Sequence, residues 1–145
     1  MKITSRTDTN AEADGLRTGP SDLGASLDLA GEPADAGLCR RLTRRKMAAE
    51  VDARKLDDVL LVVSELVANG VLHAATELVF RVRLADASLT VSVDDFDSTT
   101  GFGPEPTHKR SAEGRGLAIV DQLADRWGIT VVPGGKRVWA RFDLP

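Results

Sequence analysis

The chain has 145 residues, of which 42% are hydrophobic and 28% are charged, and its formal net charge at pH 7 is -3. This length and balance predict one globular domain, and the acidic charge excludes a general attraction to nucleic acid or anionic membrane. The single cysteine, Cys39, excludes an intramolecular disulfide, and we expect it to be a core residue in a reducing compartment. No apolar run is long enough for a signal peptide or a membrane span, so we predict a soluble, cytoplasmic protein with no membrane partner.

The N-terminal half of the chain predicts a tail, a strand and two helices. Residues 1–24 are mostly polar residues and glycine, and we expect a disordered tail ahead of a single domain over residues 25–145. Residues 25–30 alternate in the manner of a half-buried strand. A first helix is predicted from Pro33 to Val51, because proline suits the first helical turn. Its second half is basic. A second helix is predicted from Asp52 or Ala53 to Ala75.

The C-terminal half predicts four further strands and a third helix. In chain order the segments are strand 77–84, strand 88–95, a long loop 96–113, helix 114–127, strand 129–132 and strand 137–144. Short turns between neighbouring strands indicate antiparallel pairing. We therefore predict an α+β fold, a two-layer sandwich in which a mixed, mostly antiparallel sheet carries helices on one face.

Three polar side chains interrupt the apolar second helix at intervals of four residues: Glu65, Asn69 and His73. This spacing brings them to one helix face, where burial is costly unless the protein or a ligand provides partners. A carboxylate one turn from an amide oxygen suits Mg²⁺ bound with nucleotide phosphates, because Mg²⁺ then takes few ligands from protein. His73 fits contact with a phosphate and packing at the helix end equally well.

The strand predicted over residues 88–95 ends on Asp95, within the run V-S-V-D-D-F-D. Alternation places Asp95 on the same face as Val91 and Val93. A carboxylate there can accept a hydrogen bond from an exocyclic amine, which is the chemistry that selects adenine over guanine. The alternative is a turn residue, because aspartate is common at strand ends.

Two glycines flank Arg115 in the run E-G-R-G-L-A-I-V, immediately before the third helix. Gly114 and Gly116 allow backbone amides to approach an anion at the helix N-terminus, and Arg115 adds a positive charge. The alternative is that the two glycines only begin the helix. The preceding loop contains Gly101 and Gly103 and predicts a lid that closes onto phosphates. The chain has no G-x-x-x-x-G-K-[ST] motif, which excludes a P-loop protein.

Together these motifs resemble the GHKL ATPase superfamily, whose nucleotide-binding domain is the Bergerat fold. The shared order is E-x-x-x-N on a helix, a strand-end aspartate, a flexible loop, and G-x-G-L before a helix. The chain is most similar to the single-domain anti-sigma-factor serine kinases of actinobacteria. The matching runs are V-S-E-L-V-A-N-G-V-L-H-A, G-R-G-L-A-I-V-D-Q-L-A-D-R-W-G and G-G-K-R-V-W-A, and the resemblance spans residues 26–144.

The resemblance implies a role for each motif, with ATP and Mg²⁺ as cofactors. Glu65 would be the general base that activates the attacking hydroxyl or water, and Asn69 would be the Mg²⁺ ligand. Asp95 would bind the adenine amino group. The other implied ATP-binding residues are His73, Gly101, Gly103, Gly114, Arg115, Gly116 and Leu117.

Two positions depart from the pattern of the superfamily. In the superfamily the adenine-binding aspartate usually begins the run D-x-G-x-G. This chain has D-F-D-S-T instead, with Asp97 and Thr99 at the glycine positions. The last strand often carries threonine near that aspartate, whereas this chain has Arg137. Added bulk and negative charge at the bend are expected to weaken nucleotide binding, while Gly101 and Gly103 restore flexibility a few residues later.

The resemblance implies an anti-sigma factor that binds a sigma factor, phosphorylates a serine on an anti-sigma-factor antagonist, and forms a homodimer. Glu65 favours catalysis, because a pure binding module needs no base there. The D-F-D-S-T run favours the alternative, a non-catalytic ATP-dependent protein-binding switch of the same fold.

A third interpretation is a structural or nucleic-acid-binding domain that uses the basic face from Arg40 to Lys46. No aromatic residues are interleaved on that face, and the chain is acidic overall, so we predict no direct nucleic-acid partner. The same residues fit either a solvated helix face or a patch that recognises an acidic protein.

Overall fold

The structure, a computed structural model, describes residues 23–74, 76–97 and 114–145, and at residues 114–116 the backbone alone. Most of the predicted tail, together with Thr99, Gly101 and Gly103, lies outside the described residues. Within the described ranges the elements are, in chain order, β1 (Leu23–Leu29), α2 (Asp35–Met47), α3 (Ala53–Ala74), β2 (Leu78–Ala85), β3 (Ser88–Asp95), α4 (Gly114–Leu123), β4 (Arg126–Val132) and β5 (Gly135–Asp143).

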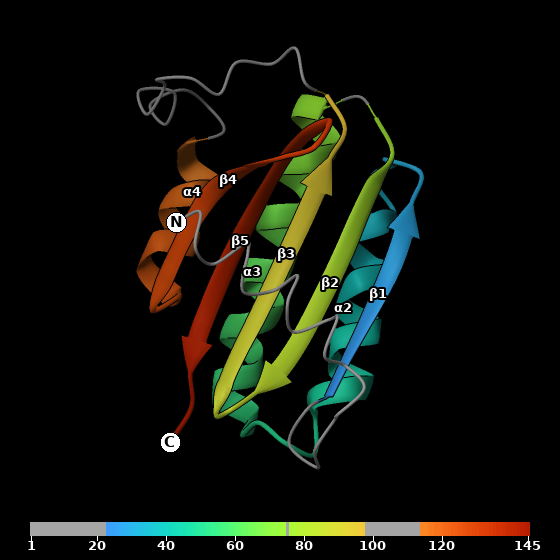
Figure 1. Ribbon diagram of the computed structural model, residues 1–145. Coiled ribbons are helices and arrows are strands. Elements are labelled where there is room, and N and C mark those ends of the chain that lie inside the picture. The colour runs from blue at the N-terminus through green and yellow to red at the C-terminus, as the bar shows by residue number, and fades with distance from the viewer. Residues whose placement is uncertain (1–22, 75, 98–113) are drawn as a thin grey trace.

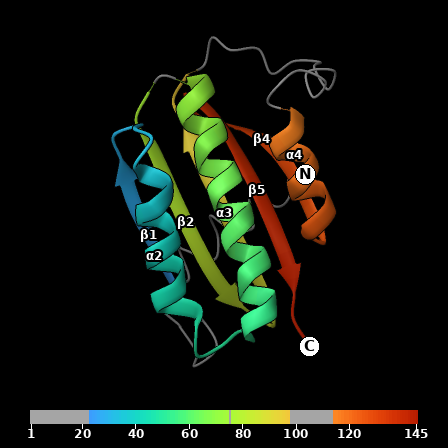
Figure 2. The same cartoon turned by 180° about the vertical axis from the view of Figure 1, so that it is seen from behind.

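The described strands form one sheet in the order β1-β2-β3-β5-β4, and every neighbouring pair is antiparallel. Figure 1 shows one face of this sheet, and Figure 2 shows α2, α3 and α4 side by side across the opposite face, with α3 in the centre. The predicted two-layer α+β sandwich is therefore confirmed. Its described strands include no parallel pair, so this part of the sheet is purely antiparallel rather than mixed.

The hydrophobic core lies between the sheet and the helices. Along β2 one alternate set of side chains is buried and the other is half-buried, and the buried set is Leu78, Phe80, Val82 and Leu84. From the helical side, Val63 and Leu66 of α3 are fully buried in the same cluster. Removing this apolar surface from water is the main contribution to stability.

Two aspartates fix where the first helices begin. Asp52 precedes α3 and caps it, because its Oδ1 accepts a hydrogen bond from the backbone N–H of Lys55 at 2.9 Å. Asp35 begins α2, and its Oδ2 accepts from the N–H groups of Gly31 and Glu32 at 2.8 Å each. These bonds hold the chain after Gly31 in a turn, so α2 begins two residues after Pro33, where the sequence predicted the start.

In the described part of the chain, no helix has both the length and the apolar character that a bilayer crossing requires.

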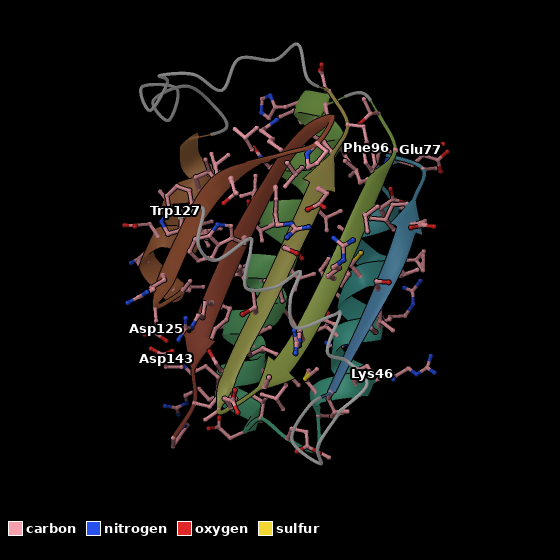
Figure 3. The ribbon with its side chains drawn as sticks, in the orientation of Figure 1. Lys46, Glu77, Phe96, Asp125, Trp127 and Asp143 are labelled. Atoms are coloured by element: carbon pink, nitrogen blue, oxygen red, sulfur yellow. The ribbon has the colours of Figure 1, made fainter. Side chains whose placement is uncertain are left out.

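The largest difference from the predicted elements is at the end of α4. The helix was predicted to continue to Trp127 but ends at Leu123. Trp127 (labelled in Figure 3) instead belongs to β4, where it pairs with Ala140. Its indole Nε1 donates to Oδ1 of Asp121 at 2.8 Å. Trp127 fits both the helical and the strand period, and pairing with β5 decides between them.

Candidate nucleotide-binding site

Three elements that carry predicted site residues meet at one end of the molecule. Figure 1 shows the carboxyl end of β3, the C-terminal end of α3 and the N-terminal end of α4 at the same end. On the helical face, α3 lies between α2 and α4 and packs against both (Figure 2). The topology therefore brings together motifs that are separated by dozens of residues in the sequence.

The polar stripe lies on the flank of α3 that faces away from α2. Ser64 marks the flank toward α2, because its Oγ accepts a hydrogen bond from Nη1 of Arg40 at 2.8 Å. Each residue turns a helix by roughly 100°, so Glu65, Asn69 and His73 lie roughly 100–180° around the axis from Ser64. Glu65 and Asn69 are half-buried and His73 is exposed. The predicted stripe is thus one surface, on the side of α3 where α4 packs.

Gly70 brings the same stretch of α3 close to the end of the sheet. A Cβ atom at this position would lie 3.1 Å from Cδ1 of Leu78 and 3.2 Å from Cγ1 of Val93. Leu78 is the register partner of Asp95, and Val93 precedes Asp95 by two residues. Glycine inside a helix costs about 1 kcal/mol relative to alanine, and close packing offsets that cost here. Asn69 is consequently one residue from the point where α3 meets the end of β3.

Asp95 lies on the helical side of β3 and is 4% exposed. Val91 and Val93 precede it on the same face and belong to the core, as the alternation predicted. Its Oδ2 accepts a hydrogen bond from Nζ of Lys136 at 2.6 Å, and its Oδ1 accepts from the backbone N–H of Asp97 at 3.1 Å. A buried carboxylate needs such partners, because removing it from water is otherwise costly.

Lys136 contacts Asp95 and is a candidate site residue that the sequence pattern did not predict. It stands directly opposite Asp95 in the β3–β5 register, and its side chain is 14% exposed. The two residues are 41 positions apart. The signal available in the sequence was its place at the start of the last strand, next to the glycine turn, but the register that pairs it with Asp95 is a long-range property.

Arg137, which was predicted to lie near Asp95, points to the other face of the sheet. Its Nε and Nη2 donate to the carboxylate of Asp94 at 2.6 and 2.9 Å, and Arg81 approaches the same carboxylate at 3.0 Å. Side chains of successive strand residues point to opposite faces, which explains the separation. Lys136 is therefore the residue of β5 that contacts Asp95, whereas Arg137 belongs to a buried ion pair on the face of the sheet opposite the helices.

The bend after β3 is anchored by backbone hydrogen bonds. Asp97, at the position of the first superfamily glycine, donates its N–H to Asp95 and is half-buried. Phe96 is 47% exposed, and its N–H donates to Oγ1 of Thr76 at 3.2 Å. Figure 3 shows Phe96 at the end of the molecule where β3 finishes.

The glycine motif forms the beginning of α4. The backbone of Gly114, Arg115 and Gly116 is helical, and Leu117 is 9% exposed and part of the core cluster. The unpaired N–H groups of a first helical turn attract anions, so the position of this turn beside α3 suits a phosphate.

The oxygen donors of the stripe fit a cation that arrives with a nucleotide. Among the described residues, no group of three or more His, Cys, Asp or Glu side chains is placed to hold a metal ion. Mg²⁺ bound with phosphates needs only one or two protein oxygens, keeping water in its other positions. The amide of Asn69 and the carboxylate of Glu65 are donors of this kind.

Comparison with known families matches residues 29–142 to the histidine kinase-like ATPase domain. The chain belongs to this family, which confirms the GHKL superfamily predicted from the motifs and gives ATP as the class of ligand. A comparison with curated proteins found no match.

One similar solved structure is that of the RsbU and RsbW domains of Rv1364c from Mycobacterium tuberculosis, with a TM-score of 0.64 and 23% sequence identity. The match covers 83% of this chain and 32% of that one, so this chain spans about a third of its length. At this identity the likeness is one of fold.

Proposed function

We propose that the protein is an ATP-binding anti-sigma factor that phosphorylates a serine on an anti-sigma-factor antagonist. The observation that carries the proposal is that the end of β3 at Asp95, the C-terminal end of α3 and the first turn of α4 lie at one end of the molecule (Figure 1). ATP requires an oxygen ligand for its metal ion, a hydrogen-bond acceptor for the adenine amine and a helix N-terminus for its phosphates.

In this proposal Asp95 accepts a hydrogen bond from the adenine amine, and Asn69 holds Mg²⁺. A cation held there would supply positive charge that offsets the negative charge of the phosphates during transfer. The N-terminal turn of α4, with Arg115, binds the phosphates, and His73 lies one helical turn beyond Asn69 as a further phosphate contact. Adenine recognition and metal binding thus come from different elements, and only the folded chain brings them together.

Glu65 is the proposed general base. Its carboxylate takes the proton from the serine hydroxyl as the serine oxygen attacks the γ-phosphorus, and the bond from that phosphorus to the ADP oxygen breaks. Phosphoryl transfer depends mainly on positioning and charge neutralisation, so this small set of groups is sufficient.

The proposed partners, a sigma factor and an antagonist, derive from the likeness of the sequence motifs to anti-sigma-factor kinases. The same likeness supports a homodimer, which sedimentation equilibrium would measure. An RsbW domain in the structurally similar protein is in accord with this assignment, although the likeness there is one of fold.

A second candidate is a non-catalytic switch that binds ATP and changes protein partners. The D-F-D-S-T run favours it, because Asp97 brings a negative charge to the bend beside Asp95. In that case Glu65 would serve binding or structure alone.

Incubation with Mg·ATP and the antagonist encoded in the same operon, followed by mass spectrometry for phosphoserine, separates the two candidates. We expect phosphoserine to form, and Glu65→Ala to slow its formation by roughly 10²–10⁴-fold, the usual contribution of a general base. Glu50→Ala removes an exposed carboxylate between α2 and α3 and is the matched control. Partner regulation with no phosphoserine, unchanged in Glu65→Ala, would favour the switch.

A further inference from the structure

The ammonium of Lys136 has hydrogen-bonding capacity that the described part of the protein does not use. Its Nζ lies 2.6 Å from Oδ2 of Asp95, and the two side chains are 14% and 6% exposed. An ammonium carries three N–H donors. Among the described residues Lys136 makes no other hydrogen bond or ion pair, so two of its donors remain for a ligand or water.

Asp95 and Lys136 together present an acceptor and a donor side by side. The Watson–Crick edge of adenine has the complementary order, in which the exocyclic N6 amine is a donor and the adjacent ring N1 is an acceptor. One base edge can therefore satisfy both side chains while their own ion pair remains intact. A guanine or hypoxanthine edge in the same orientation would bring its O6 acceptor against the carboxylate.

We propose that Lys136 is a specificity-determining residue that donates a hydrogen bond to adenine N1 while Asp95 accepts from N6. The assignment rests on the proposed ATP site, and it adds a second, charged contact to the base. A solely structural ion pair, in which water takes the two remaining donors of Lys136, is the competing explanation, and it predicts equal affinity for ATP and for an analogue that lacks N1. In a further alternative, Lys136 pairs with Asp95 and competes with adenine for it. Removal of Lys136 would then raise the affinity for ATP.

Calorimetric titration of the wild-type protein with Mg·ATP and with Mg·1-deaza-ATP tests the assignment directly. The analogue replaces N1 with C–H and keeps the N6 amine and the phosphates. Because hydrogen bonds to charged groups contribute strongly, we expect the Kd of the analogue to be roughly tenfold or more higher. Equal Kd values would overturn the assignment of Lys136 to N1 and leave the ATP site standing, whereas binding of neither nucleotide would overturn both.

Lys136→Met, which removes the ammonium and retains a long apolar side chain, supplies the second measurement. We expect it to bind ATP as weakly as the wild type binds 1-deaza-ATP and to lose discrimination between the two nucleotides. Lys46→Met on α2 is the matched control and retains the discrimination. A tighter affinity of Lys136→Met for both nucleotides would identify a competing lysine and overturn the proposal. Circular dichroism of each variant establishes that it is folded, and the wild-type comparison stands without any variant.

Discussion

Cys39 shows how burial controls chemistry at the scale of a single residue. Its side chain is fully buried in the core cluster, and burial, with a smaller contribution from the negative charge of Asp35, raises the pKa of the thiol from 9.0 to about 12. At pH 8 roughly one thiol in ten thousand would then be ionised, and only the thiolate reacts. We expect a disulfide reagent at pH 8 to label the native protein orders of magnitude more slowly than the urea-unfolded chain. Similar rates in the two states would contradict the core assignment.

The raised pKa of Cys39 also fixes the sign of a pH effect on stability. The unfolded chain releases the proton near pH 9, whereas the folded protein retains it until about pH 12. Between these values the unfolded state binds fewer protons, so the free energy of unfolding falls as pH rises. Urea unfolding of wild type, compared with Cys39→Ala, would isolate this contribution, which is about 1 kcal/mol between pH 9 and pH 10.

At this scale the sequence predicted the placement of residues whose signal is local. The four-residue spacing put Glu65 and Asn69 on one helix flank, and alternation put Asp95 on the core side of β3; the structure agrees with both placements. Lys136 could not be found in this way, because its partner is set by the β3–β5 register and by the pleat that turns Arg137 to the other face.

At the scale of elements, the β4–β5 hairpin supports the end of β3 through a close approach. Gly135 is the first residue of β5, and a Cβ atom there would overlap the carbonyl oxygen of Asp95 and lie 2.9 Å from Cα of Phe96. Gly135→Ala should therefore lower the free energy of unfolding by about 1–3 kcal/mol, as overpacking does. It should also weaken Mg·ATP binding, because the backbone of Asp95 must shift.

The neighbouring Gly134 provides the matched control for that prediction. Its φ is +83°, and a Cβ atom there would meet nothing within 4 Å. Gly134→Ala should cost about 1–2 kcal/mol through backbone strain alone and leave the Kd for Mg·ATP unchanged. Urea unfolding and calorimetry on both variants are the measurements. Equal Kd values for Gly135→Ala and Gly134→Ala would contradict the proposed link between β5 and the nucleotide site.

Element order and type could be predicted, while element boundaries depended on tertiary contacts. The predicted strand over residues 129–132 is part of a longer strand, because the β4–β5 register continues to Arg126. Asp35 shortens α2 at its start through bonds to a preceding turn. In each case a contact outside the local pattern decides where the element begins or ends.

At the scale of the whole molecule, positive charge on an acidic protein gathers on α2. Arg41, Arg44, Arg45 and Lys46 are exposed there, and Lys46 lies at the opposite end of the molecule from Phe96 and the candidate site (Figure 3). Complementary charge speeds encounter and orients partners, and salt screens it. We expect Arg44→Glu to weaken binding of the antagonist roughly tenfold and to reduce its dependence on salt.

Surface plasmon resonance at low and high salt would measure that effect. Arg126→Glu, which reverses an exposed charge on β4, is the matched control and should bind as the wild type does. Identical salt dependence in Arg44→Glu and wild type would indicate that the basic residues of α2 form only a solvated surface.

ATP is proposed to bind where the ends of β3, α3 and α4 meet, and Asp95 is proposed to select adenine. Calorimetric titration of Mg·ATP into the wild type, Asp95→Asn and Asp28→Asn tests this proposal most directly, because Asp28 is an exposed aspartate on β1 and serves as the control. We predict that wild type and Asp28→Asn bind with the same Kd and that Asp95→Asn, shown by circular dichroism to be folded, binds roughly tenfold or more weakly. Absence of binding at millimolar Mg·ATP, or equal affinity in Asp95→Asn and wild type, would contradict the account.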